Sequence, residues 1–266
     1  MFHTVRHGQL EYLTAGNLPV PHCFTTRKGG VSGGHLASLN LGTHRGDEAE
    51  NVLENFRIVA RELDFDPRKL VLTTQTHTDI VRVVDSAHHG AGLFAPKLTE
   101  CDGLITNTPG TALAAFTADC TPILLADPVT GAVGAVHAGW RGTAARIGAK
   151  AVEAMVDAFG CDPKNICAAI GPNIAQCCFE TDMDVPKAML DAYGKEAEAS
   201  IRPAGQKYYV NLKAINALGL KQAGVTRIAV SDLCTYCDPD RFWSHRRTGQ
   251  ARGSLAAIIV CKEATP

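Results

Sequence analysis

The chain lacks any apolar run of the roughly 20 residues that a membrane-spanning helix requires. It also lacks a charge imbalance, because 26 Lys and Arg residues and 27 Asp and Glu residues leave a formal net charge of -1. Neither a membrane nor nucleic acid is therefore expected as a partner. Residues 1–9 are polar and contain no apolar core of a secretion signal, so we expect a cytoplasmic protein.

No internal repeat, low-complexity tract or clear linker interrupts the 266 residues, which we expect to form one domain over residues 1–266. Hydrophobic residues make up 45% and charged residues 20%, as in an ordinary soluble globular protein, either a monomer or a small homo-oligomer. The ten cysteines are too scattered for a small disulfide framework. We expect them to be thiols, most of them buried.

Hydrophobic periodicity and turn residues predict an α/β fold with a mixed sheet, because strands and helices do not alternate regularly. One helix begins after Thr143 as its N-cap and ends at Gly160, and Asn211 caps another that ends near Gln222. A third helix is predicted over residues 47–64. Strands are predicted at residues 20–26, 70–75, 80–84, 111–117, 122–126, 132–137, 166–170, 227–231 and 254–260.

The candidate site lies where predicted strands end. His77 follows one strand, Cys120 separates two others and His137 ends a fourth. Three ligands of this kind with one open position are the usual catalytic zinc arrangement. The spacing alone also suits two hydrogen-bonded histidines and a core cysteine, because no two of these residues form a short ligand pair such as H-x-x-x-H.

A cysteine nucleophile is a competing interpretation of the same residues. Cys120 would attack, His137 would act as its base, and Gln75 or Asp119 would orient that base. Arg141 stands in a loop before a predicted helix, where its guanidinium and the backbone N–H groups would bind an anion. A surface ion pair explains Arg141 equally well.

A second group of polar residues, Asn40, His44 and Arg45, lies in a glycine-flanked loop before a predicted helix. This loop either contacts a substrate or simply caps the helix, with Asp47 as the cap. Residues 242–249 combine aromatic and basic side chains, which suit stacking on a base and phosphate binding or a solvated turn.

Cys234 and Cys237 form a lone C-x-x-C motif. A structural zinc site of this type normally needs a second pair, and a redox site needs a βαβ start. The sequence shows neither, so neither a structural zinc nor a redox site is expected here.

Several motifs occur in a fixed order along the chain: TTRKGGVS (25–32), LNLG (39–42), QTH (75–77), DG (102–103), TADCTP (117–122), HAGWRGT (137–143), IGP (170–172), CCFE (177–180), DLCT (232–235) and SHRR (244–247). Together they resemble the laccase-domain family, also called the YfiH type, whose members are described as multifunctional purine nucleoside phosphorylases. The resemblance covers about residues 20–253.

This resemblance implies a mixed-sheet sandwich with helices packed on the sheets, and a zinc ion held by His77, Cys120 and His137. It implies phosphorolysis of adenosine, inosine and S-methyl-5′-thioadenosine, and deamination of adenosine to inosine. Purine nucleosides and phosphate are the expected partners. The expected substrate-binding residues are Asn40, His44, Arg45, Gln75 and Arg246.

The expected chemistry places a metal-activated water at the purine C6 in deamination, with Asp119 or another nearby carboxylate moving protons. In phosphorolysis, Arg141, Arg45 and Arg246 would position phosphate against the ribose C1′, where the transition state resembles an oxocarbenium ion. The catalytic residues expected are thus Cys120, His137, Asp119 and Arg141.

Three other functions remain open from the sequence. Copper-dependent polyphenol oxidation is one, but none of the ten histidines forms the H-x-H pair common in multicopper sites, although His and Cys also suit a single copper. A Cys120-dependent amidase is the second, and the resemblance implies peptidoglycan precursors as its substrates, because the family has been linked to their editing. A non-catalytic binding module stabilised by zinc is the third.

Overall fold

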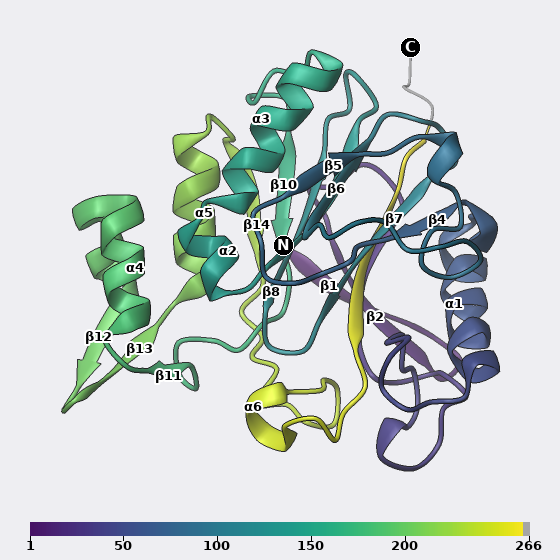
Figure 1. Ribbon diagram of the computed structural model, residues 1–266, viewed down its shortest axis with the longest axis horizontal. Coiled ribbons are helices and arrows are strands. Elements are labelled where there is room, and N and C mark those ends of the chain that lie inside the picture. Colours follow the sequence, from purple (N-terminus) through teal and green to yellow (C-terminus); the bar gives the residue numbers. More distant parts are fainter. Residues whose placement is uncertain (263–266) are drawn as a thin grey trace.

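Two six-stranded sheets lie face to face in the computed structural model, which describes residues 1–262, and a smaller third sheet stands beside them. Helix α1 (Ala49–Leu63) covers the outer face of the first sheet, and α3 (Ile147–Phe159) and α5 (Leu212–Gln222) cover that of the second. Figure 1 shows α1 on the right and α3 and α5 on the left of the strands. The predicted mixed α/β fold is confirmed.

Most neighbouring strands are antiparallel, and three pairs are parallel: β4 with β7, β5 with β6, and β10 with β14. The first sheet has the order β1 (Phe2–His7), β2 (Leu10–Ala15), β3 (His22–Thr25), β15 (Leu255–Val260), β7 (Ala112–Thr117) and β4 (Leu70–Leu72). The second has the order β14 (Arg227–Val230), β10 (Cys167–Ile170), β8 (Thr121–Ala126), β9 (Val133–Ala138), β6 (Gly103–Thr106) and β5 (Val81–Val83). The third has the order β11 (Glu180–Thr181), β13 (Lys207–Val210) and β12 (Ile201–Ala204).

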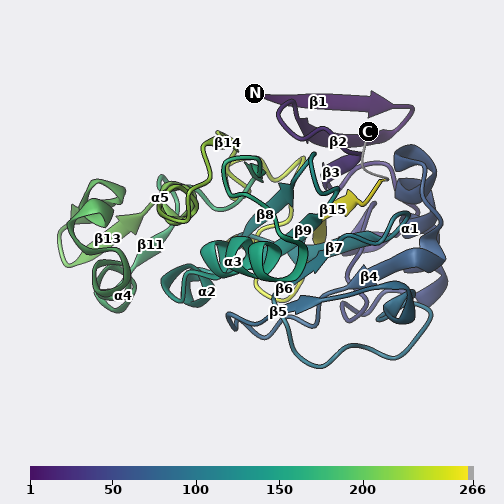
Figure 2. The same cartoon turned by 90° about the horizontal axis from the view of Figure 1, so that it is seen from above.

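The third sheet and α4 (Asp184–Tyr193) lie at the opposite end of the molecule from α1, as Figure 2 shows. No helix within residues 1–262 has the length and apolar character needed to cross a bilayer. The remaining helical segments are short: α2 (Trp140–Ala144), α6 (His245–Thr248) and the 3-10 turns Gly34–Leu36, Pro67–Lys69, Ser86–His88 and Gly194–Ser200.

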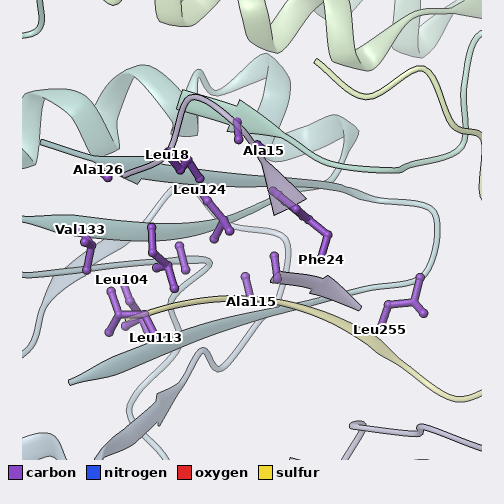
Figure 3. Close-up of a cluster of buried hydrophobic side chains, with 14 of the residues drawn as sticks. Ala15, Leu18, Phe24, Leu104, Leu113, Ala115, Leu124, Ala126, Val133 and Leu255 are labelled. Atoms are coloured by element: carbon purple, nitrogen blue, oxygen red, sulfur yellow. The ribbon is translucent and has the colours of Figure 1, made fainter. Parts of the chain in front are cut away.

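The main core lies between the two large sheets. Alternate residues of a strand point to opposite faces, so Leu124 of β8 joins the core between the sheets while Ile123 and Leu125 contact the helix layer. Figure 3 shows Leu124 with Leu113 and Ala115 of β7, gathered in this core. Burial on both faces explains why the central strands are almost entirely apolar.

The chain passes between the two large sheets twice in the region of interest. Residues 73–80 connect β4 of the first sheet to β5 of the second, and residues 118–120 connect β7 of the first to β8 of the second. Each crossing contains a non-glycine residue with positive φ, His77 at 66° and Asp119 at 88°. Both crossings carry candidate site residues.

Every predicted strand has a counterpart, and the predicted helix cap at Asn211 is confirmed, since its side chain accepts a hydrogen bond from the Ala214 N–H. The prediction of Thr143 as an N-cap is wrong. Thr143 lies inside α2, fully buried, and its hydroxyl accepts a hydrogen bond from Asn216. Arg146, with a φ of 61°, separates α2 from α3.

Candidate metal centre and the two cavities beside it

The structure brings together His77, Cys120 and His137, whose ligand atoms all lie within 4.8 Å of one another. Cys120 Sγ is 3.8 Å from His77 Nε2, and the two imidazole rings meet edge to face with centroids 5.0 Å apart. His137 is buried, Cys120 is half-buried and His77 is exposed.

The sheet pairing explains this convergence. Pro122 of β8 pairs with His137 of β9, so Cys120, two residues before Pro122, lies beside the end of β9. His77 reaches the same place from the other crossing between the sheets. Three residues that are distant along the chain therefore meet at one edge of the sandwich.

Asp102, immediately before β6, positions both histidines from a fully buried location. One of its carboxylate oxygens lies 2.7 Å from His137 Nδ1, which leaves Nε2 to face the cluster. The same carboxylate accepts hydrogen bonds from the backbone N–H groups of Thr76, His77 and Thr78 and from the Thr78 hydroxyl. Sequence reasoning missed this role, for which the short Asp-Gly motif was the only signal.

Cys120 and His137 each favour the charged form of the other. Burial opposes ionisation of the Cys120 thiol, but the neighbouring His137 and His77 rings outweigh it and lower its pKa to about 6. Burial also disfavours a charged His137, but Cys120 and Asp102 raise its pKa to about 9. Desolvation opposes ionisation of Asp102 as well, and the hydrogen bond with His137 still lowers its pKa to about 2.

The donor set fits a metal ion. Two imidazoles and a thiol suit zinc, and they also suit a single copper. A carboxylate on the far nitrogen of a ligating histidine is the usual outer partner in such sites, and Asp102 supplies it.

Two cavities adjoin the cluster. One, of about 330 Å³, is named here the Gln75 cavity and is lined by Gln75, His44, Lys97, Phe116 and Ser254 among others. The second, of about 400 Å³, is named the Trp140 cavity and is lined by Trp140, Ile174, Phe179, Leu212 and Arg246 among others. Five residues line both cavities, namely Arg45, His77, Ala118, Cys120 and Arg252. The candidate metal site therefore lies where the two cavities adjoin.

Three predicted substrate residues line the Gln75 cavity. His44 is exposed and hydrogen-bonds to Lys97, and Arg45 donates to Ser254 and Gln250. Gln75 uses its amide within the protein, because its oxygen accepts from the Phe116 N–H and its nitrogen donates to the Phe116 carbonyl.

Asn40 lies in the loop that carries His44 and Arg45 and lines neither cavity. It is fully buried, its oxygen accepts from the N–H groups of Gly42 and Ser254, and its amide donates to Asp47. Asn40 therefore shapes the loop from within.

Arg246, also predicted, lines the Trp140 cavity with its guanidinium 5.6 Å from the Phe179 ring centroid. Asp119 lines this cavity as well, but its carboxylate accepts hydrogen bonds from the Thr235 and Ser244 hydroxyls and from the Arg246 backbone N–H. Arg141 lines neither cavity, and its guanidinium stacks on Trp140 at 4.3 Å.

Arg252 is the site residue that sequence reasoning missed entirely. It is only 8% exposed, lines both cavities and forms no ion pair within residues 1–262. Its Nε has no hydrogen-bond partner in the same part of the chain. Burial, assisted by nearby Arg45, lowers its pKa to about 10, so it stays cationic near neutral pH. Its Nη1 donates a hydrogen bond to the Gly253 carbonyl. A buried cation without an ion-pair partner suits an anionic ligand.

We expect Asp102→Asn to lower the zinc affinity of the cluster about 10- to 100-fold, the usual effect of losing an outer partner. The introduced amide N–H₂ also opposes the backbone N–H donors of the His77 turn. Zinc titration with a competing chelator measures the loss. Asp85→Asn, at an exposed carboxylate away from the cluster, is the control, and equal affinity in both variants would refute the positioning role of Asp102.

The backbone of Gly139 lies directly against the cluster. A Cβ there would lie 2.6 Å from His77 Cδ2 and 3.5 Å from Cys120 Sγ, although φ −67° and ψ 172° are open to alanine. Gly139→Ala is therefore expected to displace the His77 ring and to reduce zinc affinity about 10-fold or more, with little change in melting temperature. Gly33→Ala, where nothing lies within 4 Å, serves as the matched control.

Comparison with known proteins assigns the chain to a family. The family model described as multi-copper polyphenol oxidoreductase laccase matches residues 21–262, and the chain therefore belongs to this laccase-domain family. The crystal structure of the hypothetical protein YfiH from Bacillus licheniformis superimposes with a TM-score of 0.92 at 34% identity, covering 98% of this chain and 99% of that one. The resemblance seen in the sequence is confirmed.

Two relatives have enzymatic names. The purine nucleoside phosphorylase of Deinococcus radiodurans is 42% identical over 250 residues, which cover 94% of this chain and 92% of that protein. Adenosine deaminase RL5, from an unknown prokaryotic organism, is 37% identical over 245 residues, which cover 90% of this chain and 93% of that protein.

Proposed function

We propose that the chain is a metal-dependent purine nucleoside enzyme that phosphorolyses adenosine, inosine and S-methyl-5′-thioadenosine and deaminates adenosine to inosine. The observation that carries this proposal is the His77–Cys120–His137 cluster between two cavities of different chemistry. The names of its relatives support the same substrate class.

The Trp140 cavity suits the purine. Trp140 and Phe179 offer aromatic surfaces, and Ile174 and Leu212 add apolar area, which together favour a flat heterocycle. Arg246, beside Phe179, offers hydrogen-bond donors at the edge of such a ring. Asp119 acts here as a positioning residue for the Arg246 backbone.

The Gln75 cavity suits phosphate. Arg45 and Arg252 lie on the wall shared by both cavities, and Lys97 lines the Gln75 side. A phosphate held there would face a ribose that extends from the Trp140 cavity. Its oxygen would form the new bond to C1′ as the bond from C1′ to the purine nitrogen breaks, and the guanidinium groups would hold the two reactants in place.

Zinc is the metal we propose, with copper as the alternative that the same donors admit. When bound, the ion supplies a Lewis acid that lowers the pKa of water or polarises the substrate. The protein contributes His77, Cys120 and His137 as ligands and Asp102 as the residue that orients two of them. Multicopper oxidation would need several copper sites rich in histidine. Within residues 1–262, only one candidate metal cluster contains histidine, and it has three residues.

The test is incubation of the purified, metal-analysed protein with adenosine, with and without phosphate. Chromatography separates adenine, the phosphorolysis product, from inosine, the deamination product. We expect adenine only when phosphate is present, inosine alone without phosphate, inosine together with hypoxanthine from its phosphorolysis when phosphate is present, and none of these products after chelation. Zinc-loaded protein that forms neither product would refute the proposal and favour a binding module.

A second candidate function rests on one specific observation. Cys120, His137 and Asp102 form a continuous array in which a thiol, an imidazole and a carboxylate follow one another, as in a cysteine hydrolase. An amidase of this type would survive chelation, and an alkylating reagent would block it at Cys120. The array does not use His77, so the two functions differ in their dependence on that residue.

A further inference from the structure

A second group of metal-ligating side chains lies outside the two cavities. The Sγ atoms of Cys177, Cys178, Cys234 and Cys237 all lie within 4.8 Å of one another. The sequence shows Cys234 and Cys237 as a lone C-x-x-C without a second pair. The fold supplies that pair, because the turn before β11 brings Cys177 and Cys178 beside the loop that follows β14.

The sulfur separations are those of a tetrathiolate metal site. Cys237 Sγ lies 3.7 Å from Cys177 Sγ and 3.3 Å from Cys178 Sγ. Four sulfurs around one zinc at about 2.3 Å are about 3.8 Å apart in a tetrahedron. A disulfide would need about 2.05 Å, and all four cysteines are free thiols.

The surroundings of Cys234 add two further observations. Its sulfur accepts a hydrogen bond from the Ala175 N–H at 3.3 Å, which connects the two loops and suits a thiolate. Lys213, 5% exposed, donates to the carbonyl of Leu233 and forms no ion pair within residues 1–262. Four thiolates around one divalent cation carry a net charge of −2, which a neighbouring buried ammonium complements.

We propose that these four cysteines bind a structural zinc ion. As four Zn–S bonds form, four thiol protons pass to solvent and no electron is transferred. All four coordination positions are then occupied by protein, as in structural rather than catalytic zinc sites. The proposal does not depend on the nucleoside activity.

The zinc would join two loops that form one wall of the Trp140 cavity. Ile174 and Phe179 belong to the first loop, and Arg246 belongs to the segment after the second. Asn173 and Cys234 form an isolated β-bridge, and Thr235, next to Cys234, donates a hydrogen bond to Asp119. The ion would therefore fix the wall of the cavity without contacting its contents.

The experiment counts zinc in the full-length protein, purified under reducing conditions with zinc present. We expect two equivalents per chain in the wild type and one in the double variant Cys177→Ser/Cys237→Ser, both exposed positions whose replacement spares the core. His77→Ala should also retain one equivalent, and the combined triple variant none. Cys161→Ala, at a buried cysteine that belongs to neither cluster, is the control and should retain two.

Cobalt substitution and alkylation identify the ligands. In the Cys120→Ala variant loaded with Co²⁺, the cobalt–thiolate charge-transfer band is expected to persist, and zinc should protect Cys177 and Cys237 from iodoacetamide. The proposal would be overturned if the wild type binds one equivalent of zinc and the double variant retains it. It would also be overturned if alkylation is equally fast with and without zinc. These readouts stand whether or not the chain turns over nucleosides.

Discussion

His77→Ala is expected to abolish nucleoside turnover while leaving the fold intact. His77 is exposed and lies on a turn, so its loss removes little packing, but it removes one of three ligands from the cluster. We expect kcat/KM for adenosine to fall by more than the roughly 10- to 100-fold that loss of an outer partner causes. Both phosphorolysis and deamination should fall together, and bound zinc should fall with them.

The control for His77→Ala is His88→Ala, which replaces a surface histidine away from the cluster. It should retain full activity and zinc. The variant also separates the two candidate functions, since a Cys120–His137–Asp102 hydrolase does not need His77. Full activity in His77→Ala, together with covalent trapping of Cys120 by an alkylating reagent, would decide against the metal-dependent enzyme.

Arg252→Gln is expected to impair phosphorolysis and to spare deamination. A hydrogen bond to a charged group contributes about 1.5–3 kcal/mol, which corresponds to about 10- to 100-fold in kcat/KM for phosphate. Water replaces phosphate as the second reactant in deamination, so inosine formation should change much less. The ratio of adenine to the sum of inosine and hypoxanthine formed from adenosine at fixed phosphate concentration measures the effect.

Stability provides an internal check on Arg252→Gln. A buried cation without an ion-pair partner is costly to fold, so its removal should leave the melting temperature unchanged or raised. Arg141→Gln, at an exposed arginine that lines neither cavity, is the matched control and should change the product ratio little. A larger effect in Arg141→Gln than in Arg252→Gln would place phosphate elsewhere.

Predictions from the sequence succeeded where hydrophobic pattern alone decides the structure. Strands such as β8 and β9 are buried on both faces, and their apolar runs with a turn between them were sufficient. The edge strand β1 was missed because only Phe2 and Val5 are partly buried and the rest of its sequence is polar. Helix α2 was missed because Thr143 resembles a cap, whereas its hydroxyl binds Asn216 from another helix.

The candidate ligands were predictable because each stands at a strand end within a distinctive motif. Asp102 and Arg252, which surround the candidate ligands, were harder to predict from the sequence. Asp102 acts through hydrogen bonds to two different segments, and Arg252 is notable because it is buried without an ion-pair partner within residues 1–262. Neither property can be predicted from the neighbouring residues in the sequence. The same holds for the four-cysteine cluster, since only the fold places Cys177 and Cys178 beside Cys237.

The position of β15 has a consequence for how the protein folds. This strand lies in the middle of the first sheet, between β3 and β7, and its Ala256 N–H bonds to Thr25, 231 positions away. Bringing such distant segments together costs chain entropy before any packing is gained, so refolding should be slow for a protein of this size. Ser254 and Arg252 lie one and three residues before β15, so the part of the Gln75 cavity wall that they form would be completed only once β15 has joined the sheet.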